Sequence, residues 1–238
     1  KKTKKYDKKA SVEKPDAKEN PADLREKAAL EKLPKDVQEK LKTIKVKLEK
    51  FQKRVLEKFD KYVVGMTLLP PPKPGDQKLP GTPPQPIEQK PAAQIQPNDK
   101  DKINVLVLVD DSDSKKMSKF ELKDKLTVIM KNIGQEIDKN LIPQVVILSE
   151  LWQNCYDGKN ELLQLIALSA PIFDRGMLAA IKISEIHKTM VLKKFEKYIV
   201  SYVLAGSLVQ GRATPTSDID VWIVIDDTDV KKMTRAEL

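Results

Sequence analysis

The sequence predicts an α/β protein built from two tandem domains of one architecture, each a small mixed sheet flanked by helices. Two observations carry this prediction. Residues 103–109 (INVLVLV) form an almost continuous apolar run, which is typical of a strand buried on both faces. In addition, two separate parts of the chain match each other, which indicates that one structural unit occurs twice.

The internal repeat consists of two matched pairs of segments. Residues 58–68 (KFDKYVVGMTL) match residues 194–204 (KFEKYIVSYVL), and residues 103–122 match residues 219–238, with 10 of 20 positions identical in the longer pair. The offsets are 136 and 116 residues, so the first copy carries 20 additional residues between its matched segments. The second copy has no counterpart of the chain after Leu122, and we expect the second domain to be truncated.

A basic helical arm is expected before the first domain. Residues 1–33 offer little apolar surface and are predicted to be largely disordered. A helix is predicted for residues 34–62, because Pro34 suits a first helical position and apolar residues then recur at spacings of four and three. The apolar stripe consists of Val37, Leu41, Ile44, Leu48, Phe51, Val55 and Phe59. It predicts packing onto the following domain or self-association through the 34–62 helix.

The net charge of +9 belongs to residues 1–61, which hold 21 Lys/Arg and 12 Asp/Glu. A basic segment of this kind can bind nucleic acid or another polyanion by releasing counterions. Because acidic residues are interleaved with the lysines, the favoured interpretation is a solvated helix and tail, and polyanion binding is the alternative.

The remaining elements follow in order. A proline-rich loop is predicted for residues 70–100, which hold 10 of the 16 prolines. After the strand at 103–109, we predict a helix at 116–139, a strand at 144–148 with Pro143 at its start, helices at 160–169 and 175–200, and strands at 201–205 and 219–225. The predicted domains are 34–190, a degenerate first copy that includes the loop, and 191–238, the start of the second.

A short motif in the second copy carries the candidate chemistry. The strand at 201–205 is followed by Gly206 and Ser207, and the last strand holds Asp218 and Asp220. Glycine allows a sharp turn and a close approach of the backbone to a ligand, and Ser207 opens a short helix whose N–H groups can hold phosphate. Two carboxylates two residues apart on a strand are expected to share one face, where they can hold divalent metal ions.

Taken together, Gly206, Ser207, Gly211 and the run Ser217–Asp218–Ile219–Asp220 resemble the signature of the DNA-polymerase-β-like nucleotidyltransferase superfamily, of its minimal type. The resemblance implies two tandem nucleotidyltransferase-like domains, of which only the second carries the motif. It implies transfer of a nucleoside monophosphate from an NTP to a hydroxyl acceptor. Mg²⁺ or Mn²⁺ would be held by the catalytic residues Asp218 and Asp220. Nucleotide contacts are expected from Gly206, Ser207, Gly211, Arg212 and Ser217, although Arg212 suits an exposed loop position equally well.

The first copy lacks this chemistry. Pro70 and Pro71 stand at the positions of the Gly-Ser pair, and Lys102 and Asn104 stand at the positions of the two aspartates. Prolines offer no N–H to a phosphate, and a lysine and an amide cannot hold two divalent ions. We therefore interpret the first copy as catalytically inactive. The superfamily's third carboxylate is expected beyond Leu238, so this chain by itself can be inactive.

Both copies also carry an Asp-Asp-x-Asp cluster after the long strand. The cluster could bind a cation, but the favoured interpretation is that it caps the helix that follows. The first cluster is Asp110, Asp111 and Asp113, and the second is Asp226, Asp227 and Asp229.

Composition narrows the class of protein. The single cysteine, Cys155, excludes an intrachain disulfide and a multi-cysteine zinc site within this sequence. The single histidine, His187, falls in a predicted helix and is interpreted as a surface or packing residue. No apolar run is long enough to span a membrane, and a cytoplasmic location is expected. The alternative to an enzyme is a non-catalytic scaffold that binds nucleotide or a partner protein.

Overall fold

The computed structural model describes residues 34–70, 102–114, 117–212, 214, 216–226, 228 and 234. The arm predicted for residues 1–33, and all but the first residue of the loop predicted for 70–100, lie outside these ranges. The chain divides into two units, residues 1–43 and 44–238. Of the first unit, the structure describes Pro34 and the opening turns of helix α2 (Lys35–Phe59). The fold below belongs to the second unit.

Helix α2 begins where the sequence predicts. The carbonyl of Pro34 accepts hydrogen bonds from the backbone N–H groups of Val37 and Gln38, both at 3.0 Å, which satisfies two of the free donors at the helix start. The apolar stripe is buried only in its second half, where Leu48 is 8% exposed and Phe51 and Val55 are fully buried. The end of this helix therefore packs on a core, as the stripe predicted.

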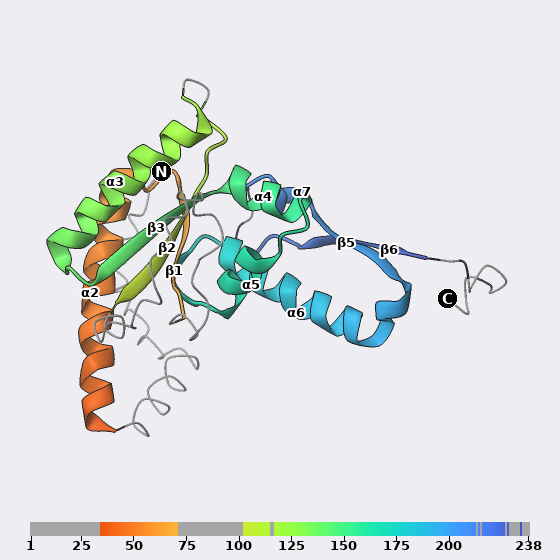
Figure 1. Ribbon diagram of the computed structural model, residues 1–238, viewed down its shortest axis with the longest axis horizontal. Coiled ribbons are helices and arrows are strands. Elements are labelled where there is room, and N and C mark those ends of the chain that lie inside the picture. The colour runs from red at the N-terminus through yellow and green to blue at the C-terminus, as the bar shows by residue number, and fades with distance from the viewer. Residues whose placement is uncertain are drawn as a thin grey trace, which may run out of the picture. The chain divides into compact units, whose positions relative to one another are not determined.

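Four strands form a mixed sheet in the order β3-β2-β1-β4 (Figure 1). The strands are β1 (Val63–Leu68), β2 (Ile103–Val109), β3 (Leu141–Ile147) and β4 (Ala170–Asp174). Strand β1 pairs antiparallel with both β2 and β4, whereas β3 pairs parallel with β2. Helix α3 (Lys119–Ile137) makes the crossover that a parallel connection requires.

Helices cover both faces of this sheet. One core holds side chains of α2 and α3 together with Val105, Val107 and Val109 of β2. The other core holds Leu106 and Leu108 of β2, beneath α4 (Leu148–Tyr156), α5 (Glu161–Leu168) and the start of α6 (Met177–Phe195). Strand β2 is thus buried on both faces, and the prediction of a small mixed sheet flanked by helices is confirmed.

Two elements of this sheet differ from the prediction. Strand β3 begins at Leu141, so Pro143 lies inside the strand and not at its start. The proline is tolerated because β3 pairs with β2 alone among the described strands, and an edge strand can lack an N–H on its free side. Strand β4 and helix α4 were not predicted. Helix α4 follows β3 directly. Its N-cap is Ile147, whose side chain cannot form the capping hydrogen bond by which a helix start is recognised in a sequence.

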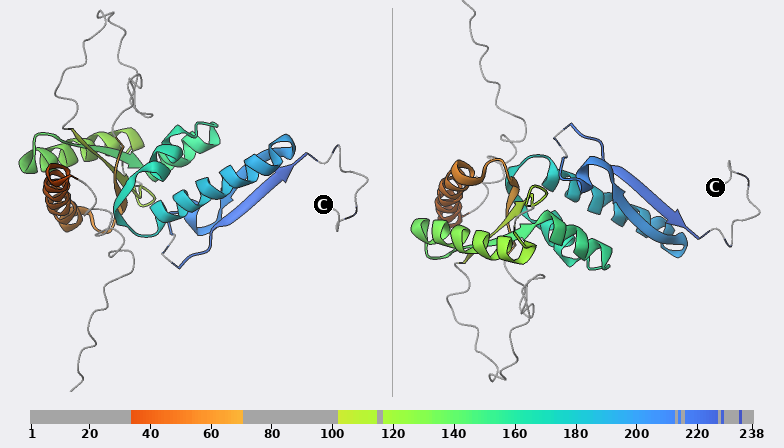
Figure 2. Two further views of the ribbon diagram at one scale, coloured as in Figure 1. Left: turned by 90° about the horizontal axis from the view of Figure 1, so that it is seen from below. Right: turned by 90° about the horizontal axis from the view of Figure 1, so that it is seen from above.

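A second, two-stranded sheet consists of β5 (Ile199–Ala205) and β6 (Asp220–Ile225), paired antiparallel and joined through the short helix α7 (Gly206–Val209). Helix α6 runs along this strand pair in both views of Figure 2. A 3-10 turn at Glu196–Tyr198 links α6 to β5 and ends the helix earlier than predicted. None of the described helices is long and apolar enough to cross a membrane.

The strand pairs β1–β2 and β5–β6 share one register. Val63 faces Val109 in the first pair, Ile199 faces Ile225 in the second, and each pair has an irregularity directly after these positions. The flanking backbone bonds also correspond. Asp110 N–H donates to the Tyr62 carbonyl at 2.8 Å, and Asp226 N–H donates to the Tyr198 carbonyl at 2.8 Å. These positions are related by the offsets of 136 and 116 residues found in the sequence.

Burial, in contrast, differs sharply between the two pairs. Leu106 of β2 is 1% exposed, whereas Trp222 at the corresponding position of β6 is 71% exposed. The next three residues of β2 are at most 3% exposed, and their counterparts in β6, Ile223 to Ile225, are 39–47% exposed. The reason is that β2 has a strand on each side and helices on both faces, whereas among the described strands β6 contacts only β5. The predicted boundary between residues 190 and 191 falls inside α6 and stays a prediction.

Candidate active site

The turn after β5 brings a glycine and an aspartate into direct contact. Ala205, the last residue of β5, pairs with Asp220, the first residue of β6. Gly206 follows with φ +72°, a conformation that side chains disfavour. A Cβ atom added to Gly206 would lie 1.9 Å from Oδ2 of Asp220. The two parts of the motif, Gly-Ser and Asp-x-Asp, therefore depend on each other: the carboxylate occupies the space that a larger residue at 206 would fill.

A buried leucine anchors the turn. Leu208 of α7 is fully buried and belongs to the core formed by Leu106, Leu108 and Val146 of the four-stranded sheet. Sequence reasoning missed this residue, and its apolar character directly after the Gly-Ser pair was the available signal. The site in the second strand pair is thus held in place by the core between the four-stranded sheet and helices α4, α5 and α6.

Gly211 closes the same turn, where its backbone lies close to the side chain of Leu148. Its N–H donates to the carbonyl of Leu208 at 3.1 Å, and a Cβ added to it would lie 2.8 Å from Cδ1 of Leu148. The backbone of Arg212 continues the closure by donating to the Ser207 carbonyl at 2.9 Å. The structure therefore gives Gly211 a packing role. The side chain of Arg212 is exposed, and Ser207 is half-buried.

Ser217 and Asp218 lie just before β6. The hydroxyl oxygen of Ser217 accepts the N–H of Thr214 at 2.9 Å, so this side chain stabilises the turn that leads into the strand. Asp218 lines a cavity of about 270 Å³ together with Asp174 and Gly176 at the start of α6. Because β6 begins at Asp220, the strand alternation that predicted a shared face for both carboxylates does not extend to Asp218.

Asp174 has a structural role at this cavity. Its Oδ1 accepts the N–H groups of Gly176 and Leu178, and its Oδ2 accepts that of Ala179, each at 2.9 Å. These bonds satisfy the free donors at the start of α6. Both carboxylate oxygens of Asp174 therefore already accept hydrogen bonds. The other carboxylate of this cavity, Asp218, has no hydrogen bond or ion pair with any described residue.

The donor set suits a hard divalent cation. Asp218 and Asp220 are both exposed, and no described side chain forms an ion pair with either. Carboxylate oxygens are the ligands that Mg²⁺ prefers, and it commonly needs only one or two of them beside water and substrate phosphate. The residues present therefore fit a magnesium ion. Among the described residues, no group of three or more His, Cys, Asp or Glu side chains is arranged to hold a metal.

The aspartates of the two Asp-Asp-x-Asp clusters that the structure describes make contacts within the fold. Oδ1 of Asp110 accepts the N–H of Ser112 at 2.9 Å, Asp111 accepts both the N–H and the hydroxyl of Ser149, and Asp113 pairs with Lys61 at 3.2 Å. In the second cluster, the hydroxyl and N–H of Thr228 donate to Asp226 and lower the pKa of its carboxyl below the usual value. The first cluster does not cap the helix that follows it, so that prediction is wrong: the N-cap of α3 is Ser118, whose hydroxyl accepts the N–H of Glu121 at 3.2 Å. The contacts of the first cluster still favour a structural role over cation binding.

A family model described as a nucleotidyltransferase domain matches residues 184–237. The matched region begins within α6 and includes β5, α7 and β6. No curated protein and no solved structure matches the chain. The carboxy-terminal part of the protein is therefore similar to a nucleotidyltransferase domain, and the matched region contains every site residue that the sequence predicted.

Proposed function

We propose that this protein transfers a nucleoside monophosphate from an NTP to a hydroxyl acceptor, in a reaction that depends on a divalent metal ion. The observation that carries the proposal is the contact between Gly206 and the Asp220 carboxylate, within the region that matches a nucleotidyltransferase domain. In this proposal, the contact is the reason that position 206 requires glycine, because any larger residue would displace the Asp220 carboxylate.

In the proposed site, Asp218 and Asp220 hold Mg²⁺ or Mn²⁺. When bound, the metal lowers the pKa of the attacking hydroxyl and offsets charge on the triphosphate. Gly206 leaves room for the Asp220 carboxylate, and Leu208 keeps the turn in position through its buried side chain. Ser207 and the exposed Arg212 are proposed to contact phosphate oxygens. Gly211 and Ser217 shape the turn on either side.

We further infer that residues 34–190 and 191–238 are two copies of one domain, the second truncated, and that the first copy is a scaffold. The shared register of β1–β2 and β5–β6, with its matching irregularity and flanking backbone bonds, supports this inference. So does the backbone bond from Leu69 N–H to the Asn104 carbonyl, because Leu69 and Asn104 correspond to the paired residues Ala205 and Asp220. Asn104 thus stands in the first copy where the second places its carboxylate. In this proposal, the first copy supplies the core that receives Leu208.

Calorimetric titration with the four NTPs, with and without Mg²⁺, tests the site. We expect Mg²⁺-dependent binding that Asp218→Asn/Asp220→Asn abolishes. Asp218→Asn and Asp220→Asn are also made singly, and Asp226→Asn is the control for each, since it removes one negative charge just after the far end of β6 and should leave binding unchanged. Equal binding by the double variant and the intact chain would refute the role of these carboxylates.

The second candidate function is a nucleotide-binding scaffold without catalysis. It is favoured by one observation, namely that β6 begins at Asp220, so strand alternation does not place Asp218 on the same face as Asp220. Both candidates predict nucleotide binding, and they differ in turnover. Release of pyrophosphate in the presence of a mixed pool of hydroxyl acceptors would support the enzyme, whereas tight NTP binding without release would support the scaffold.

A further inference from the structure

The loop that follows β2 in the four-stranded sheet lies against the motif turn. A Cβ atom added to Gly211 would lie 3.6 Å from Cγ and 3.7 Å from Oδ1 of Asp110, which are ordinary contact distances. On the side of Leu148 the approach is closer, at 2.8 Å from Cδ1. The carboxylate of Asp110 and the backbone of Gly211 are therefore neighbours, although they are distant in sequence.

The Asp110 carboxylate is fixed in this place. Its backbone N–H donates to the Tyr62 carbonyl at 2.8 Å, and its Oδ1 accepts the N–H of Ser112 at 2.9 Å. The next residue, Asp111, accepts the N–H and the hydroxyl of Ser149 at 3.0 and 2.6 Å, which ties the loop to the start of α4. Moving the carboxylate away from Gly211 would break several of these bonds.

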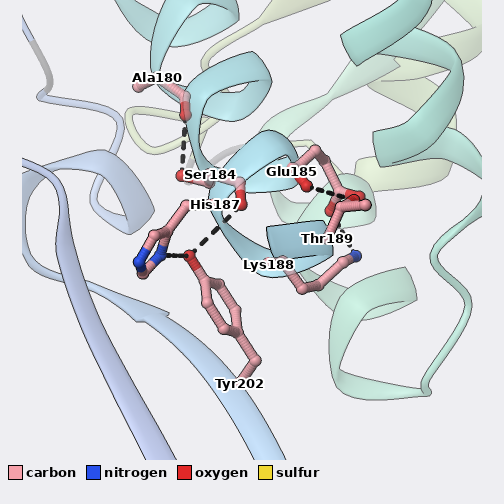
Figure 3. A network of polar contacts seen from close by, with 7 residues as sticks. All are labelled: Ala180, Ser184, Glu185, His187, Lys188, Thr189 and Tyr202. Atoms are coloured by element: carbon pink, nitrogen blue, oxygen red, sulfur yellow. Dashed lines mark hydrogen bonds and ion pairs between the residues drawn. The ribbon is translucent and has the colours of Figure 1, made fainter. Parts of the chain in front are cut away.

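The motif turn is fixed as well. Leu208 is fully buried in the core beneath it. Strand β5, which leads into the turn, is bonded to helix α6 through Tyr202, as Figure 3 shows. The Tyr202 hydroxyl lies 2.9 Å from Nδ1 of His187 and donates to the Ser184 carbonyl at 3.3 Å. We therefore expect the distance between the Asp110 carboxylate and the turn to stay the same when a ligand binds.

Two opposite charges lie near each other at this turn. The side chain of Arg212 is exposed, and no described side chain forms an ion pair with it. Consecutive Cα atoms are about 3.8 Å apart, so the Cα of Arg212 lies within about 9 Å of Oδ1 of Asp110. At this range the charge of Asp110 opposes the attraction that Arg212 exerts on an anion.

A fixed negative charge beside a phosphate site discriminates between forms of the ligand. Coulomb repulsion grows in proportion to the charge of the ligand, and Mg²⁺ neutralises part of the charge of a triphosphate. Asp110 therefore weakens the binding of free triphosphate or pyrophosphate more than it weakens the binding of their Mg²⁺ complexes. Specificity of this kind comes from repelling the unwanted ligand.

We propose that Asp110 is a specificity-determining residue of the nucleotide site. Its charge disfavours metal-free triphosphate and pyrophosphate at the turn, so that nucleotide enters as its Mg²⁺ complex. The inference rests on the proposed function, because it requires the triphosphate to bind beside Ser207 and Arg212. It gives the predicted first copy an influence on the choice of ligand, in addition to the core that receives Leu208.

Calorimetry with ATP and with inorganic pyrophosphate, each in EDTA and in Mg²⁺, tests the proposal. Asp110→Asn removes the charge and keeps an oxygen that accepts the Ser112 N–H, whereas Asp110→Glu keeps the charge and changes the packing. Asp124→Asn is the matched control. It removes one charge from an exposed position of α3, which packs on the opposite face of the four-stranded sheet from Leu208.

We expect Asp110→Asn to bind both ligands in EDTA about three- to tenfold more tightly than the intact chain at low ionic strength, with a smaller gain in Mg²⁺. The gain should shrink in about 0.5 M salt, because salt screens the interaction. Asp110→Glu and Asp124→Asn should bind like the intact chain. Equal affinities of Asp110→Asn and the intact chain in EDTA, or the same gain in Asp110→Glu, would overturn the proposal.

This outcome is separable from that of the proposed function. Mg²⁺-dependent NTP binding that Asp218→Asn/Asp220→Asn abolishes, without any gain in Asp110→Asn, would support the metal site and overturn the role of Asp110. A gain in metal-free binding that Asp110→Asn also produces in the double aspartate variant would support the role of Asp110 independently of the metal site. The absence of binding by every variant in every condition would overturn both.

Discussion

Gly206→Ala is expected to disable the motif through two separable effects. The first is backbone strain, because φ at Gly206 is +72° and an L-residue there costs about 1–2 kcal/mol. The second is steric. The new Cβ would lie 1.9 Å from Oδ2 of Asp220, and an ordinary contact distance is about 3.5 Å. The carboxylate therefore has to retreat by roughly 1.5 Å, and displacements of about 1 Å can cost a catalytic site about a hundredfold.

Gly158→Ala isolates the first effect. Gly158 has nearly the same conformation, φ +74°, but a Cβ added there meets no atom within 4 Å. We expect Gly158→Ala to lose about 1–2 kcal/mol of unfolding free energy in urea titrations, and Gly206→Ala to lose at least as much. Only Gly206→Ala should also weaken Mg²⁺-dependent NTP binding, by at least about tenfold in calorimetry. If Gly206→Ala binds NTP as tightly as Gly158→Ala, the contact between Gly206 and Asp220 does not position the carboxylate and the reasoning is refuted.

Two further predictions concern packing and ionisation. Leu106→Ala should destabilise the protein by about 2–5 kcal/mol because its side chain is buried, whereas Trp222→Ala at the corresponding position of β6 should change stability by less than about 0.5 kcal/mol. Similar losses in urea unfolding would mean that the outer face of β6 is covered in solution. Burial, reinforced by the Glu185 charge, raises the pKa of the Cys155 thiol, so its thiolate forms at higher pH in the native protein than in the unfolded chain. The pH midpoint of labelling by a thiol reagent should therefore lie higher in buffer than in urea, and a native midpoint at or below that in urea would contradict this.

Elements with strong local patterns could be predicted from the sequence. The continuous apolar run at Ile103–Val109 matches β2 at both ends, and the heptad-like stripe predicted α2. Strand β4 (Ala170–Asp174) was missed because it is five residues long, contains Pro171 and is defined by its pairing with β1. Helix α4 was missed because it follows β3 without a turn residue or a capping side chain to mark its start.

The same distinction between local sequence pattern and long-range contact applies to the site. The sequence by itself determined which residue types carry the chemistry, because Gly206, Ser207, Asp218 and Asp220 lie within 15 positions and their spacing can be read directly. Only the tertiary structure decided that Asp220 packs against Gly206, that Leu208 is buried in a core that includes Leu106 and Leu108 of β2, and that Trp152 and Tyr202 line one cavity. The physical reason is that periodicity and spacing report local backbone conformation. Contacts between residues distant in sequence depend on the shape into which all the elements pack.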